Sequence, residues 1–244
     1  MDQIAPPAVN TFGQPIGPAL PHWTPRQRPA ESSMQGRSCR LEAYDAGRHL
    51  AGLFEAYAPD GERLWTYIPW GPFADAEAMG RAIDEMSDRF QRFVIVSEPA
   101  GRPVGEASYM RHDLEGGSVE VGMVGFSPAL QRTTAATEAM YLMMRRVFDE
   151  AEYRRYEWKC DALNARSRAA ALRFGFRFEG VFRQDRVYKG RSRDTAWFSV
   201  IDREWPALKR GFEAWLTPGN FDGEGRQRMS LAVAMAAAAE LARR

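Results

Sequence analysis

The chain has 244 residues, 45% of them hydrophobic and 12% aromatic, which suits one ordinary domain with extensions or at most two small ones. Its 33 basic and 32 acidic residues give a net charge of +1, which argues against nucleic acid or an anionic membrane as a partner. Cys39 and Cys160 can form no disulfide framework, and their spacing fits no metal site. The N-terminus lacks a signal-peptide pattern and no apolar run reaches the ~18 residues that span a bilayer, so we expect a cytoplasmic protein without membrane or metal.

The first 38 residues are rich in proline and show no helical or alternating period, so we interpret residues 1–38 as an extended arm. Apolar residues within it, including Phe12 and Trp23, favour some docking on the main body. A strand is predicted at Cys39–Tyr44. Asp45 is then placed to cap a helix whose apolar face has helical spacing: Leu50, Leu53, Phe54 and Tyr57.

The middle of the chain alternates helix and strand. A loop punctuated by Pro and Gly precedes a helix predicted at Asp75–Phe90, and a turn at 98–103 separates the next two strands. The further predicted elements, in chain order, are strands near Phe93–Ser97, Val104–Arg111 and Ser118–Val124, a helix after residue 137, a strand at Tyr156–Asp161, a short helix after Asn164, strands at about 178–188 and 193–202, a helix at Trp205–Leu216 and an Ala-rich helix from about 227 to 244. This pattern indicates a mixed α/β sheet covered by helices. We divide the chain into the arm 1–38, a domain 39–216 and a linker with tail helix 217–244.

One stretch, from Ser118 to Phe176, carries the functional information. A strand containing Glu120 leads into a polar loop that opens a helix, and a second strand ends in Asn164-Ala-Arg-Ser167. Free amides at a helix N-terminus bind phosphate groups well. The loop by itself also fits an ordinary capped helix.

This order of parts resembles the GCN5-related N-acetyltransferase (GNAT) superfamily, in particular its ribosomal-protein N-acetyltransferase branch, over about residues 39–216. The resemblance implies a mostly antiparallel central sheet with splayed parallel strands at its centre. It also implies acetyl-CoA as the donor, with CoA as the product, and a primary amine as the acceptor.

The superfamily's pyrophosphate loop is written Gln/Arg-x-x-Gly-x-Gly/Ala. The resemblance therefore implies cofactor contacts by Gln131, Arg132, Thr133, Thr134, Ala135, Ala136 and Thr137. The central Gly is replaced by Thr134, which must either donate its hydroxyl or hold ordinary helical angles.

Further cofactor contacts are implied at the second strand and the splay. Asn164 would pair with the pantetheine amides, and Ser167 would donate a hydrogen bond to the leaving thiolate; a helix cap is the alternative role for both. Many members of the superfamily place a Tyr acid where this chain has Ala171. The backbone N–H groups near Val124 and Phe126 would polarise the thioester carbonyl.

Glu120 is the best candidate for a general base, because an acid flanked by valines on this strand would be partly buried and therefore basic enough, directly or through water. The alternative is a Glu at the strand edge that faces solvent or an Arg. The chain shows no Ser–His–Asp motif, nucleophile elbow or Walker loop, and Cys160 reads as core.

Two further groups of residues could contact the acceptor. The aromatic loop would line its entrance through Trp65, Tyr67, Trp70 and Phe73, although burial against the helices is equally compatible. Basic residues gather on the last predicted hairpin: Arg183, Arg186, Lys189, Arg191 and Arg193. A solvated face is the ordinary interpretation of this cluster, and a rim that selects a carboxylate-bearing acceptor is the alternative.

We therefore expect an N-acetyltransferase that moves an acetyl group from acetyl-CoA to a primary amine, on a small molecule or a protein N-terminus, by direct attack in a ternary complex. The alternatives are a non-catalytic acyl-CoA-binding module, a transferase for another acyl group such as succinyl, and an interaction platform. The sequence also leaves a homodimer open.

Overall fold

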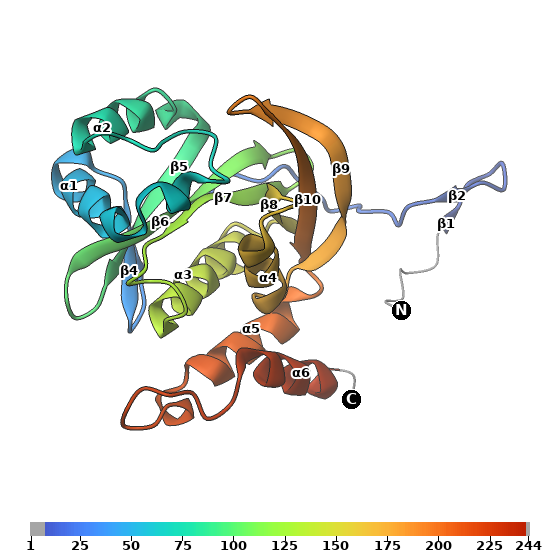
Figure 1. The fold of residues 1–244 in the computed structure, drawn as a ribbon. Helices are drawn as coiled ribbons and strands as arrows, with labels where there is room; N and C mark the ends of the chain where they lie inside the picture. Colours follow the sequence, from blue (N-terminus) through green and yellow to red (C-terminus); the bar gives the residue numbers. More distant parts are fainter. Residues whose placement is uncertain (1–7, 243–244) are drawn as a thin grey trace.

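The computed structural model describes residues 8–242 and contains an eight-stranded mixed sheet (Figure 1). The strand order is β3-β4-β5-β6-β7-β8-β10-β9, and only the central pair β7–β8 is parallel. The strands are β3 (Met34–Gln35), β4 (Cys39–Ala43), β5 (Phe90–Ser97), β6 (Arg102–Asp113), β7 (Ser118–Phe126), β8 (Arg155–Asp161), β9 (Arg177–Tyr188) and β10 (Arg191–Ile201). The predicted fold class, mixed α/β with parallel strands at the centre, is confirmed.

Helices cover the two faces of the sheet unequally. One face carries α1 (Ala46–Tyr57) and α2 (Ala76–Asp84), packed over β4 to β6, while α3 (Thr134–Arg145), α4 (Ala165–Arg173) and α5 (Trp205–Leu216) cover the other. Side chains alternate along the strands, so Val94 and Val96 contact the α1 side while Val119 and Val121 belong to the α3 core. On the α1 side the strands β7, β8 and β10 carry polar side chains, among them Glu120, Lys159 and Thr195.

The helix starts predicted at Asp45 and Asp75 are confirmed, and the end predicted for the second of these helices is wrong. The helix expected after residue 137 already begins at Thr134, and the tail helix expected from about 227 begins at Leu231. Asp45 caps α1 by accepting the N–H of Arg48 at 2.9 Å, and Asp75 caps α2 through Ala78 at 2.7 Å. The helix predicted to reach Phe90 instead ends at Asp84, followed by a 3₁₀ turn at Ser87–Arg89. Phe90 opens β5, opposite Met110 of β6, because ladder pairing within the sheet outweighs the local helical period.

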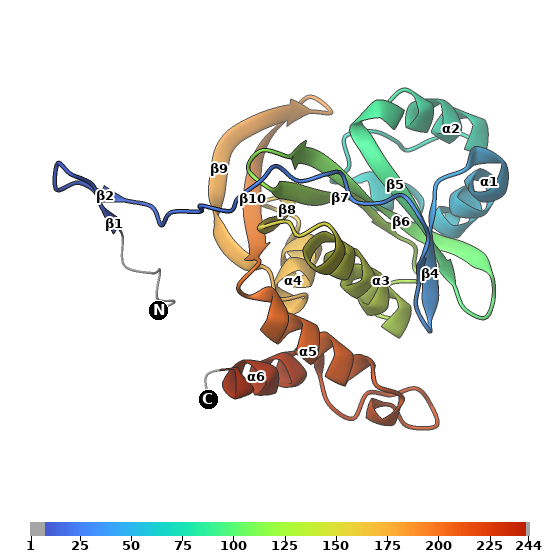
Figure 2. The ribbon, with the colours of Figure 1, turned by 180° about the vertical axis from the view of Figure 1, so that it is seen from behind.

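The N-terminal segment has a projecting part and an anchored part. The hairpin of β1 (Ala8–Val9) and β2 (Pro15–Ile16) extends away from the body, and Phe12 on it is 85% exposed. From Trp23 onward the segment is anchored: the Trp23 indole donates to the Glu115 carbonyl at 2.8 Å. It then crosses the molecule from the side of β9 and β10 to β4 (Figure 2). The expected docking therefore holds for Trp23 and not for Phe12.

The C-terminal helix α6 (Leu231–Leu241) packs along α5. Its buried residues are Leu231, Ala234 and Ala238. Gly211 of α5 permits the close approach, because a Cβ there would lie 2.8 Å from the Cα of Met235. The predicted end of this helix at Arg244 lies outside the described residues.

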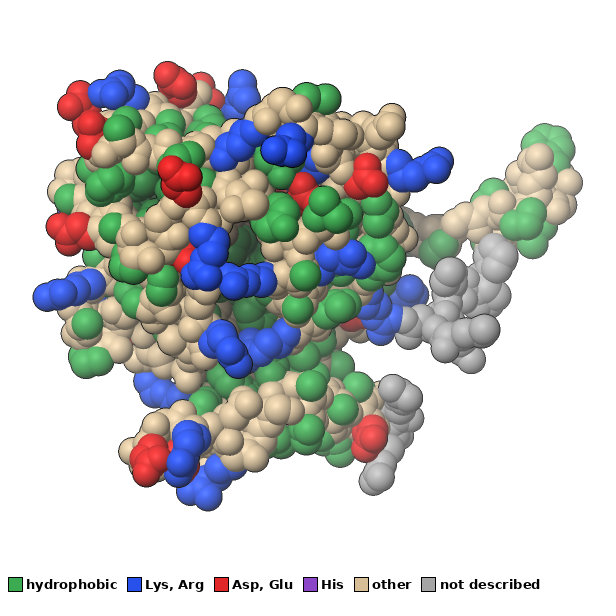
Figure 3. All heavy atoms as spheres, in the orientation of Figure 1, with side chains coloured by type: hydrophobic (Ala, Val, Ile, Leu, Met, Phe, Trp, Pro, Cys, Tyr) green, Lys and Arg blue, Asp and Glu red, His purple; other side chains and the backbone are tan. Residues whose placement is uncertain are grey.

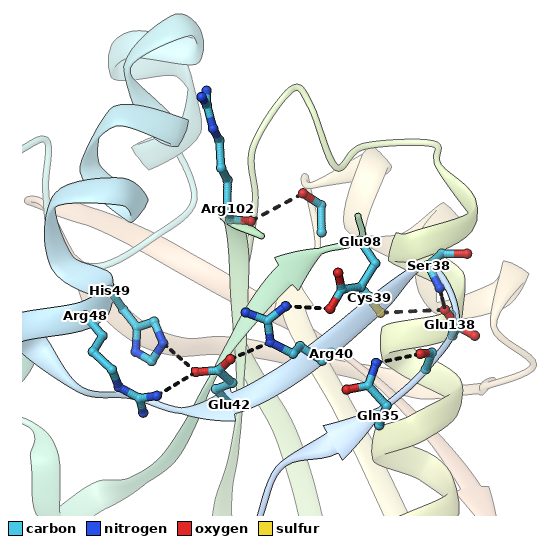
Figure 4. A network of polar contacts seen from close by, with 12 residues as sticks. Gln35, Ser38, Cys39, Arg40, Glu42, Arg48, His49, Glu98, Arg102 and Glu138 are labelled. Carbon is cyan, nitrogen blue, oxygen red and sulfur yellow. Dashed lines mark hydrogen bonds and ion pairs between the residues drawn. The ribbon is translucent and has the colours of Figure 1, made fainter. Parts of the chain in front are cut away.

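A network of charges, which we call the edge network, fixes β4 to its surroundings (Figure 4). Arg40 contacts Glu42 and Glu98, each at 2.5 Å. Glu42 also contacts Arg48 at 3.0 Å and His49 at 3.1 Å. The hydrogen bond from Arg40 is the main cause that lowers the pKa of Glu42. Each charge in this network has a partner within it.

Candidate active site

The two parallel strands at the centre of the sheet separate part of the way along. β7 pairs with β8 only from Ser118 to Val121. Beyond that point β7 carries a bulge, where two residues oppose one on β6 and Met123 has a φ of +53°. β8 continues against β10 instead. A cleft of about 2020 Å³ opens at this separation.

The N-terminus of α3 forms one wall of the cleft. Arg132 has a φ of +64°, and Thr133 caps the helix by accepting the N–H of Ala136 at 3.2 Å. The N–H groups of Thr134 and Ala135 stand in the first turn, where no acceptor exists inside the helix. Thr134 is helical, so the replacement of Gly there costs no backbone strain. Gln131 donates its side-chain amide to the Phe126 carbonyl at 2.8 Å and so fastens the loop to the end of β7.

Most of the predicted loop residues line this cleft, with one exception. Gln131, Thr133, Ala136 and Thr137 contribute to its lining together with Arg132 and Thr134. Ala135 does not, because it packs toward β4, where its carbonyl accepts the Cys39 thiol at 3.5 Å.

The start of α4 forms the facing wall. The side chain of Asn164 caps α4 by accepting the N–H of Ser167 at 3.1 Å. The Ser167 hydroxyl accepts the Trp158 indole N–H at 3.0 Å and also lies within hydrogen-bonding reach of the Cys160 thiol. Ala171 is fully buried in the core and does not line the cleft. Cys160 lines it, but burial raises the pKa of its thiol, which suits a core residue rather than a nucleophile.

Glu120 lies on the floor of the cleft and is only 3% exposed. Its Oε2 contacts Arg111 Nη1 at 2.5 Å and Lys159 Nζ at 3.0 Å. Lys159 also contacts Glu157 at 2.7 Å, and its ammonium lies 3.6 Å from the centre of the Trp197 ring. The other carboxylate oxygen, Oε1, lies toward Gly122, where a Cβ would be 3.5 Å away. We call this group of charges the cleft network.

The aromatic loop closes the cleft on the α1 side. Trp65, Tyr67 and Trp70 line it, whereas Phe73 lies behind Trp65 at a ring-centre distance of 5.0 Å. The Tyr67 hydroxyl donates across to the Leu163 carbonyl at 3.3 Å. Lys189, at the tip of the β9–β10 hairpin, donates to the Trp65 carbonyl at 2.7 Å. The loop and the hairpin therefore meet over the same opening.

Several lining residues were not predicted as site residues. Lys159 could have been noticed, because its alternation with Glu157 places both charges on one face of β8. Arg173 donates to the Thr137 hydroxyl at 2.9 Å and lies 5.5 Å from the Trp215 ring centre. Trp215 and Arg226 also line the cleft. They lie beyond the Ser118–Phe176 stretch, and no pattern in the sequence indicates that they reach it.

Residues 8–242 hold no cluster of His, Cys, Asp and Glu that could bind a metal ion. Over the same range, no helix is long and apolar enough to cross a membrane.

Comparison with known proteins fits this geometry. Residues 40–177 match the acetyltransferase (GNAT) domain family. A GCN5-related N-acetyltransferase from Brucella melitensis is 44% identical over 89% of this chain and 100% of its own, with a TM-score of 0.86. A probable GNAT-family acetyltransferase from Chromobacterium violaceum is 40% identical over 79% of this chain and 97% of its own, with a TM-score of 0.73.

A more distant structure shares only the fold. It is RimJ from Mycobacterium smegmatis in complex with CoA-disulfide, which is 18% identical over 88% of this chain and 98% of its own, with a TM-score of 0.63. A search among curated proteins gave no match. The family match covers more than half of the chain and the identity to the Brucella structure is high, so this chain belongs to the GNAT family and is an N-acetyltransferase.

Proposed function

We propose that this enzyme transfers an acetyl group from acetyl-CoA to a primary amine by direct attack, with both substrates bound together. The observation that carries this proposal is the continuity of the cleft. It joins the α3 N-terminus, the separation of β7 from β8, and the polar floor around Glu120. A donor and an acceptor entering from opposite ends would meet where the strands separate.

The chemistry of the α3 wall fits CoA. First-turn N–H groups at Thr134 and Ala135 favour a pyrophosphate, and Arg132 and Arg173 add positive charge to the same wall. The pantetheine arm would run between β7 and β8, past the free side-chain N–H₂ of Asn164. The complex of the distantly related RimJ with CoA-disulfide supports this choice of ligand.

Acetyl-CoA supplies the acetyl group as an activated thioester. Ser127 donates its N–H to Val104 of β6 at 3.1 Å, so strand alternation directs the Phe126 N–H away from β6, toward the cleft. The N–H groups of Phe126 and Val124 would stabilise the negative charge that develops on the carbonyl oxygen. The Ser167 hydroxyl proton would stabilise the departing thiolate.

Glu120 would accept the proton that the attacking amine loses. Both cations bind Oε2, so Oε1 remains for the amine or for a bridging water. The same cations hold the carboxylate in place, because a buried charge without partners is strongly destabilised. Arg111 and Lys159 would therefore position the carboxylate of Glu120 and leave Oε1 able to accept the proton.

The test is release of CoA, followed with a thiol reagent, across a panel of primary amines that includes short peptides with free N-termini. Acetyl-CoA and succinyl-CoA are compared as donors. A thermal shift with CoA alone tests the binding half separately. CoA binding without release in the presence of any amine would favour a non-catalytic module. Preferred release with N-terminal peptides would support the ribosomal-protein branch.

A further inference from the structure

Arg193 of β10 is a buried cation without a counter-ion. It is only 9% exposed, and within residues 8–242 it forms no ion pair and no side-chain hydrogen bond. Its Nε is buried and unpaired. Its one close aromatic neighbour is Tyr188, whose ring centre lies 5.8 Å from the guanidinium carbon. The side chain lines the cleft, so a ligand there would supply the partner that this largely buried charge lacks.

The acidic side chains around Arg193 are engaged elsewhere. Asp161 accepts the Tyr188 hydroxyl and the Leu163 N–H, both at 2.8 Å. Asp185 accepts the Thr195 hydroxyl at 2.7 Å and pairs with Arg186 at 3.1 Å. Arg193 therefore lies near these acids, but within residues 8–242 it forms no ion pair with either of them.

Arg193 lies on the acceptor side of the cleft. Along β10 it shares a face with Thr195 and Trp197, and Trp197 stands opposite Lys159, which contacts Glu120. This is the polar face on the α1 side of the sheet. Arg193 and Glu120 line the same cleft, and Lys and Arg side chains gather around the hollow at its mouth (Figure 3).

We propose that Arg193 binds a carboxylate of the acceptor, so that the substrate is a primary amine that also carries a carboxylate. The proposal rests on the function proposed above. A planar guanidinium matches a carboxylate through paired N–H donors. One unpaired positive charge also balances a single negative charge better than the nearly double charge of a phosphate. The nearby Arg186 adds no free charge, because Asp185 neutralises it.

The test uses matched acceptors at saturating acetyl-CoA: ω-amino acids from β-alanine to 6-aminohexanoate, and n-alkylamines of the same chain length. We expect the best amino acid to have a kcat/KM about 10–100-fold above its alkylamine, the range of a hydrogen bond to a charged group. Arg193→Gln should remove that advantage. Arg191→Gln, an exposed position on the same hairpin, is the matched control and should keep it.

The outcomes distinguish a failure of the carboxylate proposal from a failure of the proposed acetyl transfer. If no amine of either kind releases CoA, the proposed function fails. If alkylamines react as well as amino acids, or if both Arg variants retain the advantage, the role of Arg193 is overturned while the function stands. Aminoalkyl phosphates form a third arm, and their preference over amino acids would overturn the carboxylate. If Arg193→Gln does not fold, Arg193→Lys replaces it, and the wild-type panel still tests the preference for a carboxylate.

Discussion

The edge network and the cleft network contain the same kinds of charged side chain, but their roles differ. At β4, Arg40, Glu42, Glu98, Arg48 and His49 satisfy one another. In the cleft, Glu120 binds its two cations through one oxygen, and Arg193 forms no ion pair within residues 8–242. The charges at β4 pair with one another, which fits a structural role. A buried charge without an ion pair at the cleft fits a ligand contact instead.

The largest expected effect is on kcat, which a Glu-to-Gln change should lower in the cleft network and not in the edge network. Glu120→Gln keeps the shape of the side chain and removes the proton acceptor, so we expect kcat to fall about 10²–10⁴-fold, the usual value of general-base help. Glu42→Gln in the edge network should leave kcat unchanged. Steady-state thiol release measures both, and a CoA thermal shift shows that cofactor binding persists. Equal turnover of wild type and Glu120→Gln would show that Glu120 only positions its neighbours.

The second prediction compares stability. Lys159 is buried and bridges Glu120 and Glu157, so Lys159→Met leaves two buried carboxylates beside each other. We expect the free energy of unfolding to fall by about 3 kcal/mol, the low end for a broken buried pair, because Arg111 still pairs with Glu120 and Arg155 with Glu157. Arg40→Met breaks pairs nearer to solvent and should cost about 0–1 kcal/mol. Urea unfolding measures both variants, and similar losses in the two would contradict the distinction between the networks.

Ser167 offers a third, smaller effect on the opposite wall of the cleft. Ser167→Ala removes the proposed hydrogen bond to the thiolate and should lower kcat about 10–150-fold. The cap of α4 belongs to Asn164, so Asn164→Ala should instead lower stability by about 1 kcal/mol. Kinetics and thermal melting are measured on both variants. If Ser167→Ala kept full turnover but melted at a lower temperature, the role of the hydroxyl would be structural, through its hydrogen bond with the Trp158 indole.

The smallest effect is the pH dependence of the edge network. The pKa of Glu42 is lowered in the folded state, chiefly by Arg40, so its carboxylate stabilises the fold above its ordinary pKa of 4.5. That contribution is lost as pH falls through the lowered value. The free energy of unfolding of the wild type should therefore exceed that of Glu42→Gln by less than ~1 kcal/mol at pH 7. The gap should close below pH 4.5, and a gap that widens in acid would contradict the assignment.

Local patterns predicted most elements of this fold because their signals are short-range. Asp45 and Asp75 stand just before apolar helical periods, and each caps its helix as such residues do. The helix predicted to run on to Phe90 failed because the competing interaction was a strand pair with Met110, which no local period reveals. The loop after Phe126 opens a helix as its spacing indicated, yet Ala135 points away from the cleft.

Residue patterns alone predicted the alternation of helix and strand, a capped helix after the polar loop, the family, and the order of Glu120 and Ser167 in the motifs. Which charged side chains form ion pairs became visible only in the folded arrangement. Arg193 and Asp185 lie close together in a segment with many acidic and basic residues. No local pattern indicates that the Asp185 carboxylate binds Thr195 and Arg186. Strand register and burial make that choice, because they fix which side chains share a face and which lose water.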